Sequence, residues 1–289
     1  VSRLFYKRGT IYCTTYIYSS TTGTVPGIAV QYCILLEYTQ VNFGILNLFF
    51  EANYKNIISI KVSKLSGAEL KNNKIALCAG NIATPEAAKF LIKLGVDIIK
   101  IGIGPGSICT TRLVAGIGVP QLSAILSVRK GIKNKNVKII SDGGIKYSGD
   151  LAKAFAAGAD AVMIGSLFAG TDETPGKLIK KNGKLFKSFR GMGSVGAMNK
   201  GSADRYFQTK QKDSSKYVPE GVEGFVKYKG DVGSIIYKLI GGLKSSMGYL
   251  GSKNILKLRN KPNFVKITKA GFYESMVHNV DVIKNDSKY

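Results

Sequence analysis

A glycine-rich loop that contains a cysteine carries the most specific chemistry in this sequence. The loop reads GIGPGSICTTR over residues 102–112. Backbone N–H groups of the glycine-rich turn and the guanidinium of Arg112 would favour the thiolate form of Cys109. A thiolate here could attack an electrophilic carbon of a substrate. A lone cysteine is more often a small buried hydrophobe. That alternative suits Cys78, within an apolar run, better than it suits this polar loop.

The other reactive side chains narrow the chemistry further. The 289 residues include one histidine, His278. A single histidine excludes a histidine-cluster metal site and any catalytic pair of histidines. The four cysteines are widely separated and form no CxxC pair. Zinc ribbons and disulfide frameworks are therefore not expected, and we expect a reduced, cytoplasmic protein.

Strands and helices that could position the cysteine loop alternate from about residue 70 onward. Short apolar runs predict strands over 74–80, 96–104, 136–144 and 159–166. Apolar residues at helical spacing predict helices over 84–95, 120–132 and 148–158. Thr84 and Ser148 are the expected N-caps of the first and last of these helices. Strands alternating with helices predict βαβ units with right-handed crossovers.

Each predicted strand ends in a loop that contains glycine. The loops read CAGN, GIGPGS, SDGG and IGS. In a closed (β/α)₈ barrel the carboxyl ends of the strands face one side, where ligands bind. Backbone N–H groups of such loops can hold a phosphate. The glycines could instead serve only to permit tight turns. Four such loops in succession favour a ligand that carries phosphate.

Charge and hydropathy set the expected partners. The formal net charge is +24, which raises the possibility of nucleic-acid binding. The lysines are scattered without an aromatic-interleaved stripe, so we attribute them to a lysine-rich composition and expect no nucleic-acid partner. Polar residues interrupt the apolar segment 27–50, so we expect no membrane span. The N-terminus lacks the ordered regions of a signal peptide.

The cysteine loop and three further motifs resemble the inosine-5′-monophosphate (IMP) dehydrogenase family. The motifs are SDGGIKYSGDLAKAFAAGADAVMIGSLFAGTDETPG, FRGMGSVGAMNKGSADRYFQ and VPEGVEG. The resemblance covers residues 72–289 and implies the α/β class, a (β/α)₈ TIM barrel of which only the C-terminal half is clearly represented. GMP reductase, a sister family, shares the cysteine loop, but DRYFQ and VPEGVEG favour the dehydrogenase.

The resemblance implies a two-step reaction at Cys109. The thiolate would attack C2 of IMP, and hydride would leave C2 for NAD. Water would then hydrolyse the covalent thioimidate to xanthosine monophosphate (XMP), aided by Thr111, Arg205 and Tyr206. A mobile flap around residues 195–225 would bring Arg205 to the site after NADH leaves. Because the pKa of arginine is very high, Arg205 would need partial neutralisation or would only position the water.

Binding residues also follow from the resemblance. The substrate phosphate would contact Ser107, Gly144, Gly165 and Ser166. The ribose would bind Asp142, and the purine would lie against Met192, Gly193 and Glu220. NAD would contact Asn81, Gly102 and Gly104. A potassium ion would bind carbonyl groups of Gly104, Gly106 and Cys109, completed by Glu274, Ser275 and Met276 from a neighbouring subunit, which implies a homotetramer.

The sequence departs from the family in several places. Phe189 stands where the family usually has tyrosine, so one hydroxyl for the phosphate is lost, worth about 0.5–1.5 kcal/mol and up to about 3 if that hydrogen bond is charged. Met276 replaces a common histidine. Residues 1–71 form an atypical segment without the family's first four strands, its regulatory CBS modules or its NAD-ribose motif.

These departures leave alternatives to an active dehydrogenase. The chain could be a truncated or frame-shifted product, and half a barrel would expose two sheet edges. Residues 26–50 are apolar enough to supply one or two strands, so the fold would be marginal or completed by another copy. The alternative functions are GMP reductase, a catalytically dead purine-nucleotide-binding remnant, and a basic RNA-binding protein.

Overall fold

The computed structural model describes residues 78–281, apart from 133–135, 210, 212 and 261, and five strands nearer the N-terminus. Those five are β1 (Arg3–Lys7), β2 (Thr10–Thr15), β3 (Gln31–Leu36), β4 (Gly44–Ile45) and β5 (Ile75–Ala76). The remaining predictions for residues 1–77 lie outside the described residues.

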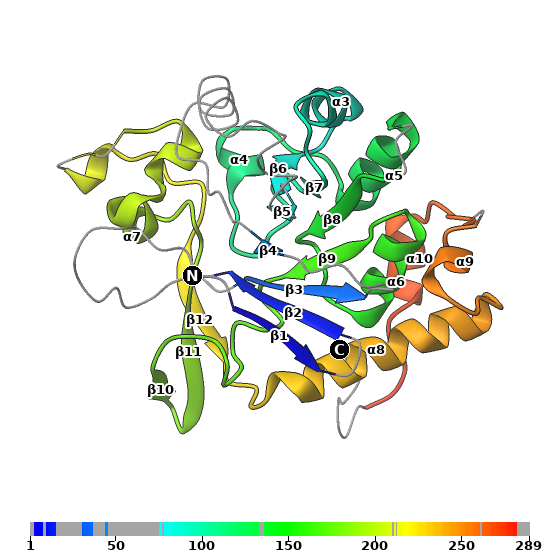
Figure 1. Cartoon of the computed structure of the whole chain (residues 1–289). Helices are drawn as coiled ribbons and strands as arrows, with labels where there is room; N and C mark the ends of the chain where they lie inside the picture. The colour runs from blue at the N-terminus through cyan, green and yellow to red at the C-terminus, as the bar shows by residue number, and fades with distance from the viewer. Residues whose placement is uncertain are drawn as a thin grey trace.

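Four parallel strands form one side of the main sheet (Figure 1). They are β6 (Cys78–Ile82), β7 (Ile98–Ile101), β8 (Lys138–Asp142) and β9 (Ala161–Ile164). The alternation of strands and helices is confirmed. Strand β9 is wholly buried, as a parallel strand covered on both faces must be. Cys78 is half-buried, less enclosed than expected for a core residue.

An antiparallel meander extends this sheet beyond β9. The order is β1-β2-β3-β9-β8-β7-β6, and Tyr32 of β3 pairs with Ile164 of β9. The expected open edge beside β9 is therefore occupied, and in the described part of the chain β1 and β6 are the edges. Strands β3 and β4 fall within residues 26–50, the range expected to supply one or two strands.

The helices that follow the parallel strands pack on the sheet and against one another (Figure 1). They are α3 (Pro85–Lys93), α5 (Gln121–Gly131) and α6 (Ser148–Ala156), and the longer α8 (Val232–Tyr249) packs on α6. The short helices are α4 (Thr111–Val114), α9 (Ile255–Leu258) and α10 (Lys269–Glu274). In the described part of the chain, no helix is long and apolar enough to cross a membrane.

Of the two predicted N-caps, one is confirmed and one is wrong. The hydroxyl of Thr84 accepts a hydrogen bond from the N–H of Ala87 at 3.3 Å. Ser148 is the first residue of α6 rather than its cap, which is Tyr147. The carboxylate of Asp150 accepts the N–H groups of Lys146 and Tyr147 at 3.0 and 3.1 Å. Asp150 therefore caps the helix from inside its first turn.

A second sheet carries the segment that covers the loops. It contains β10 (Leu178–Lys181), β11 (Lys184–Arg190) and β12 (Glu223–Lys227), all antiparallel. Between β11 and β12 lie the short helices α7 (Val195–Ala197), η1 (Met198–Ser202), η2 (Ala203–Tyr206) and η3 (Ser214–Lys216). We call residues 194–219 the lid. Its buried residues Met198, Ala203 and Tyr217 form a small core of their own.

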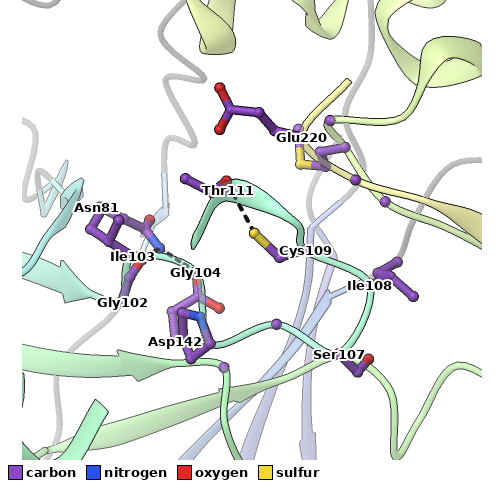
Figure 2. Close-up of a pocket in the computed structure, with 18 of the residues that line it drawn as sticks. Asn81, Gly102, Ile103, Gly104, Ser107, Ile108, Cys109, Thr111, Asp142 and Glu220 are labelled. Carbon is purple, nitrogen blue, oxygen red and sulfur yellow. Dashed lines mark hydrogen bonds between the residues drawn. The ribbon is translucent and has the colours of Figure 1, made fainter. Parts of the chain in front are cut away.

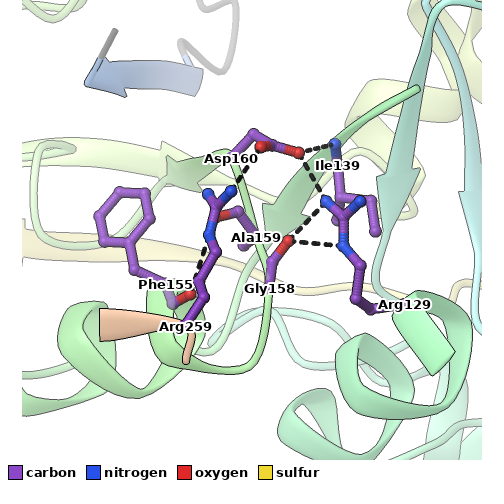
Figure 3. Close-up of polar contacts among 7 residues, drawn as sticks. All are labelled: Arg129, Ile139, Phe155, Gly158, Ala159, Asp160 and Arg259. Carbon is purple, nitrogen blue, oxygen red and sulfur yellow. Dashed lines mark hydrogen bonds and ion pairs between the residues drawn. The ribbon is translucent and has the colours of Figure 1, made fainter. Parts of the chain in front are cut away.

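Two arginines hold Asp160 at the amino end of β9 (Figure 3). Nη2 of Arg129 lies 2.6 Å from one carboxylate oxygen, and Nη1 of Arg259 lies 2.9 Å from the other. The N–H of Ile139 donates to the first oxygen at 2.8 Å. The arginines also donate to the carbonyls of Gly158 and Ala159. This network joins β8, β9 and the C-terminal segment at the end of the sheet away from the glycine loops.

Candidate functional site

The carboxyl ends of the parallel strands and the lid enclose a cavity of about 590 Å³ (Figure 2). It is lined by the loops after β7, β8 and β9, by Asn81 near the end of β6, and by lid residues. Every residue assigned above to catalysis, substrate or NAD lines this cavity: Cys109, Thr111, Arg205, Tyr206, Ser107, Asp142, Gly144, Gly165, Ser166, Met192, Gly193, Glu220, Asn81, Gly102 and Gly104. The structure therefore brings them together, while their individual roles stay predictions.

Cys109 lies in a tight turn at the start of α4, facing the cavity (Figure 2). Its N–H donates to the carbonyl of Gly106 at 3.1 Å, which closes the turn. Its sulfur is 3.2 Å from the hydroxyl oxygen of Thr111. The hydroxyl can donate to a thiolate or accept from a thiol. Thr111 can therefore stabilise the charged, nucleophilic form of Cys109.

The guanidinium of Arg112 also stabilises the loop, through hydrogen bonds to backbone carbonyl groups. Its guanidinium donates to the carbonyl oxygens of Ile103 and Val119, at 2.6 Å for Val119. A Cβ built on Gly104 would lie 2.6 Å from Cγ of Arg112, so only glycine allows this approach. The sequence suggested that Arg112 favours a thiolate by its charge. The structure adds a structural role, because the guanidinium links the start of the loop at Ile103 to Val119, beyond the end of the loop.

Main-chain hydrogen bonds join the cysteine loop to the segment that follows the lid. The N–H of Thr110 donates to the carbonyl of Glu220 at 2.9 Å, and the N–H of Val222 donates to Ile108 at 3.0 Å. Cys109 and Gly221 form the antiparallel bridge between these two bonds. The N–H of Glu220 in turn donates to Gly193 at 2.9 Å. Cys109 is thus fixed to the segment just before β12, which is itself bonded to the segment just after β11.

Arg205 and Tyr206 come from η2 of the lid and reach the same cavity. Burial raises the pKa of the Tyr206 phenol, and the adjacent Arg205 opposes that shift. Cys109 and Glu220 are close enough to raise this pKa further as negative charges. A neutral phenol beside the thiol can donate a hydrogen bond to substrate or water. A Cβ on Gly193 would lie 2.8 Å from Cζ of Tyr206, so this contact requires glycine.

Asp142 has two donors on one of its carboxylate oxygens. Nδ2 of Asn81 lies 2.9 Å and Nζ of Lys100 lies 3.1 Å from Oδ2. Within the described residues both donors use the same oxygen, which leaves Oδ1 for a ligand hydroxyl. The sequence analysis missed Lys100, although a lysine in the otherwise apolar run IIKI of β7 could have signalled a buried ion pair.

Gln121 is a second residue that the sequence analysis missed. Its side-chain amide donates to the carbonyl of Ile101 at 2.8 Å and to the hydroxyl of Ser141 at 3.0 Å. It therefore links the ends of β7 and β8 directly beneath the loops that carry Gly102 and Asp142. A polar residue at the first position of α5, directly after Pro120, was the available signal.

Phe189 lines the cavity next to the turn that follows β9. A Cβ built on Gly165 would lie 4.0 Å from Cζ of the Phe189 ring. The ring edge therefore points to the backbone where a phosphate is expected. A hydroxyl at Cζ would face this turn, which gives the departure from the family's tyrosine a location in the structure.

The residues expected to bind potassium fall into two separate groups. Gly104, Gly106 and Cys109 line the cavity, whereas Glu274, Ser275 and Met276 lie exposed at the end of α10 and do not. The prediction places these groups on different subunits, so it stays untested in one chain. Within the described residues, no cluster of three histidine, cysteine or acidic side chains could hold a metal ion.

Comparisons with known proteins agree on one family. The IMP dehydrogenase / GMP reductase domain profile matches residues 55–278. IMP dehydrogenase from Chlorobaculum parvum is 55% identical over 221 residues, which is 76% of this chain and 45% of that protein. IMP dehydrogenase from Methanocaldococcus jannaschii is 57% identical over 224 residues, 75% of this chain and 45% of that protein. The chain thus spans about 45% of the length of these curated relatives.

A solved structure shows the same likeness in three dimensions. GMP reductase from Trypanosoma brucei, a cysteine-to-alanine variant crystallised with guanosine 5′-monophosphate, has a TM-score of 0.67 and 47% sequence identity. The match covers 76% of this chain and 44% of that chain.

Proposed function

The chain belongs to the IMP dehydrogenase / GMP reductase family, whose fold is the TIM barrel, and we propose that its cavity oxidises IMP to XMP with NAD. The observation that carries the proposal is the meeting of Cys109, Thr111, Arg205 and Tyr206 around one cavity. A nucleophile, a hydroxyl that stabilises it, and two groups able to orient water are the parts that a covalent oxidation and hydrolysis require.

The proposed reaction divides into two balanced steps. In the first, the sulfur of Cys109 forms a bond to C2 of IMP, and the hydrogen on C2 leaves with its two electrons as hydride. When bound, NAD accepts that hydride. In the second, water adds to the same carbon, the C–S bond breaks, and the thiolate returns with release of XMP and a proton. Arg205 and Tyr206 hold the attacking water, and Thr111 stabilises the thiolate in both steps.

The proposal places a dinucleotide beside the nucleotide in this cavity, and one buried polar atom supports it. Oδ1 of Asn81 is buried without a hydrogen-bond partner in the described part of the chain. This acceptor suits the amide group of a nicotinamide. Gly102 and Gly104 line the same cavity, and Ile117 adds an apolar surface. Potassium at the Gly104–Cys109 turn, shared between subunits of a homotetramer, is part of the same proposal.

Measurement of NADH formation, together with thiol protection, tests the main proposal. Purified protein should form NADH from IMP and NAD in potassium buffer, and Cys109→Ala should abolish this while Cys78→Ala, the matched control, retains it. IMP should also protect Cys109 from a thiol reagent. Protection without NADH formation would overturn the dehydrogenase assignment and indicate a nucleotide-binding remnant. Absence of both would overturn nucleotide binding altogether.

GMP reductase is the second candidate, favoured by the likeness to a GMP-bound reductase. Both reactions would use Cys109 as nucleophile, so the thiol alone does not separate them. The same preparation should be incubated with GMP and NADPH. Consumption of NADPH with release of ammonia, in the absence of activity on IMP, would identify the reductase.

A further inference from the structure

Lys229 lies behind the turn that follows β9, on the chain just beyond β12. Its ammonium group donates to the carbonyl of Ser166 at 3.0 Å and to the carbonyl of Leu167 at 2.8 Å. Its own N–H donates to the carbonyl of Gly170 at 2.9 Å. Gly165 and Ser166 of the same turn line the cavity, whereas Lys229 does not. Lys229 therefore contacts the turn from the side away from the ligand.

These contacts fix the orientation of the turn. A peptide group is planar, so holding a carbonyl oxygen also fixes the N–H of the next residue. The peptide groups held in this way are Ser166–Leu167 and Leu167–Phe168, directly after the Gly165–Ser166 backbone where an anion is expected to bind. The N–H of Phe168 donates back to the carbonyl of Gly165 at 3.1 Å, so the held residues also fix Gly165. The ammonium also places a positive charge directly behind them. Lys229 is half-buried, which lowers its pKa and leaves its charge less screened by water.

We propose that Lys229 is a positioning residue for the phosphate group of the bound nucleotide. It holds the Gly165–Ser166 turn in its anion-binding form and supplies part of the positive potential there. The inference rests on the proposed function, because it requires the cavity to bind a nucleoside monophosphate. Lys229 lies outside the cavity, and it favours binding of the phosphate rather than of the purine or the ribose.

A second lysine, Lys187 of β11, provides a contrast, because it binds carbonyl groups farther along the loop that follows β9. Lys187 is only 4% exposed, and its ammonium donates to the carbonyls of Thr171 and Thr174 at 2.6 and 2.7 Å. These residues do not line the cavity. Lys187 should therefore support the fold without selecting for phosphate. Comparing the two positions separates a general structural effect from phosphate positioning.

The test compares a nucleotide with its nucleoside. Protection of Cys109 from a thiol reagent is titrated with IMP and with inosine, for the wild-type protein, Lys229→Gln, Lys229→Arg and Lys187→Met. Lys227→Gln, an exposed lysine of β12, is the matched control. Lys229→Gln should raise the half-protecting IMP concentration about tenfold or more, because a charged interaction is lost, and leave that of inosine unchanged. Lys229→Arg, which keeps the charge, should lose less.

The other possible outcomes distinguish failure of the proposed role of Lys229 from failure of the proposed function. Equal weakening of IMP and inosine in Lys229→Gln, or an effect matched by Lys227→Gln, would overturn the positioning role while leaving nucleotide binding intact. Should Lys229→Gln fail to fold, Lys229→Arg must still weaken IMP more than inosine, and equal effects would overturn the inference. If wild-type Cys109 is protected by neither ligand, the proposed function fails and this inference with it. In active protein, Lys229→Gln should raise KM for IMP far more than it lowers kcat.

Discussion

Replacing Asp160 by asparagine should destabilise the protein without impairing the cavity. The two oxygens of Asp160 accept from Arg129, Arg259 and the N–H of Ile139 at 2.6, 2.9 and 2.8 Å. An asparagine side chain has only one acceptor oxygen, so it can accept the hydrogen bonds of only one side of the network. The substitution also removes the negative charge between two guanidinium groups (Figure 3). The side chains are 17–27% exposed, so solvent screens the interaction only partly.

The magnitude follows from these contacts. Losing one charge-assisted hydrogen bond costs about 1.5–3 kcal/mol. Removing a whole partner from a buried ion pair costs about 3–5 kcal/mol. Both arginines keep carbonyl partners at Gly158 and Ala159. We therefore expect a loss of about 2–4 kcal/mol in the free energy of unfolding. For a domain of this size that corresponds to a fall in Tm of roughly 4–15 °C.

The assay is thermal and denaturant unfolding of Asp160→Asn beside Asp281→Asn, which makes the same chemical change at an exposed position. Asp160 precedes Gly165 by five residues of extended chain, roughly 16 Å at strand spacing. IMP protection of Cys109 at low temperature should therefore be unchanged. Unfolding of the two variants at the same temperature would refute the argument that the network stabilises the fold. Loss of IMP protection in a folded Asp160→Asn protein would refute its separation from the site.

Three further predictions concern the cavity. Phe189→Tyr should lower the KM for IMP roughly 2- to 10-fold, because a hydroxyl at Cζ would reach a phosphate at the Gly165 turn; an unchanged KM in an IMP titration would show that the phosphate lies elsewhere. Gly193→Ala should lower kcat about tenfold or more with a small change in Tm, since its Cβ would lie 2.8 Å from the Tyr206 ring. Gly224→Ala, which meets open space, is its control in kinetics and melting curves. Because burial raises the pKa of Tyr206 above its usual value of 10.0, its phenol stays protonated well into the alkaline range. The pH–rate profile between about pH 7 and 9 should therefore keep its shape in Tyr206→Phe, and a shift of its alkaline limb would contradict this.

The parallel strands and the cysteine loop were predictable because their signals are local. Short apolar runs ending in glycine mark β6 to β9, and Cys109 follows directly from its loop sequence. Pairing between distant segments has no such signal. The antiparallel contact of Tyr32 with Ile164 depends on sheet geometry rather than on either short sequence. The same is true of the joining of Cys109 to Gly221.

Buried charges were the second group that the sequence could not reveal. The lysines were attributed to a general compositional bias, yet Lys187 and Lys229 each bind backbone carbonyls. A lysine on an exposed surface and one that fixes a loop have the same residue type and similar neighbours in sequence. Only the fold shows which carbonyl groups meet the ammonium. Asp160 lacked a signal for the same reason, because its two arginines lie far away along the chain.

The hydrogen bonds between the cysteine loop and the segments that flank the lid bear on how the lid would open. The hydrogen bonds of Thr110 and Val222 join residues 220–222 to the cysteine loop, and those of Gly191 and Glu220 join residues 191–193 to residues 220–222. If a flap opens here, we expect its hinges to lie within residues 194–219, while the flap bounds of 195–225 stay a prediction. Since Met198, Ala203 and Tyr217 pack together, that part would swing as one small domain carrying Tyr206. In such an opening Cys109 would keep its position, while Arg205 and Tyr206 would move with the lid.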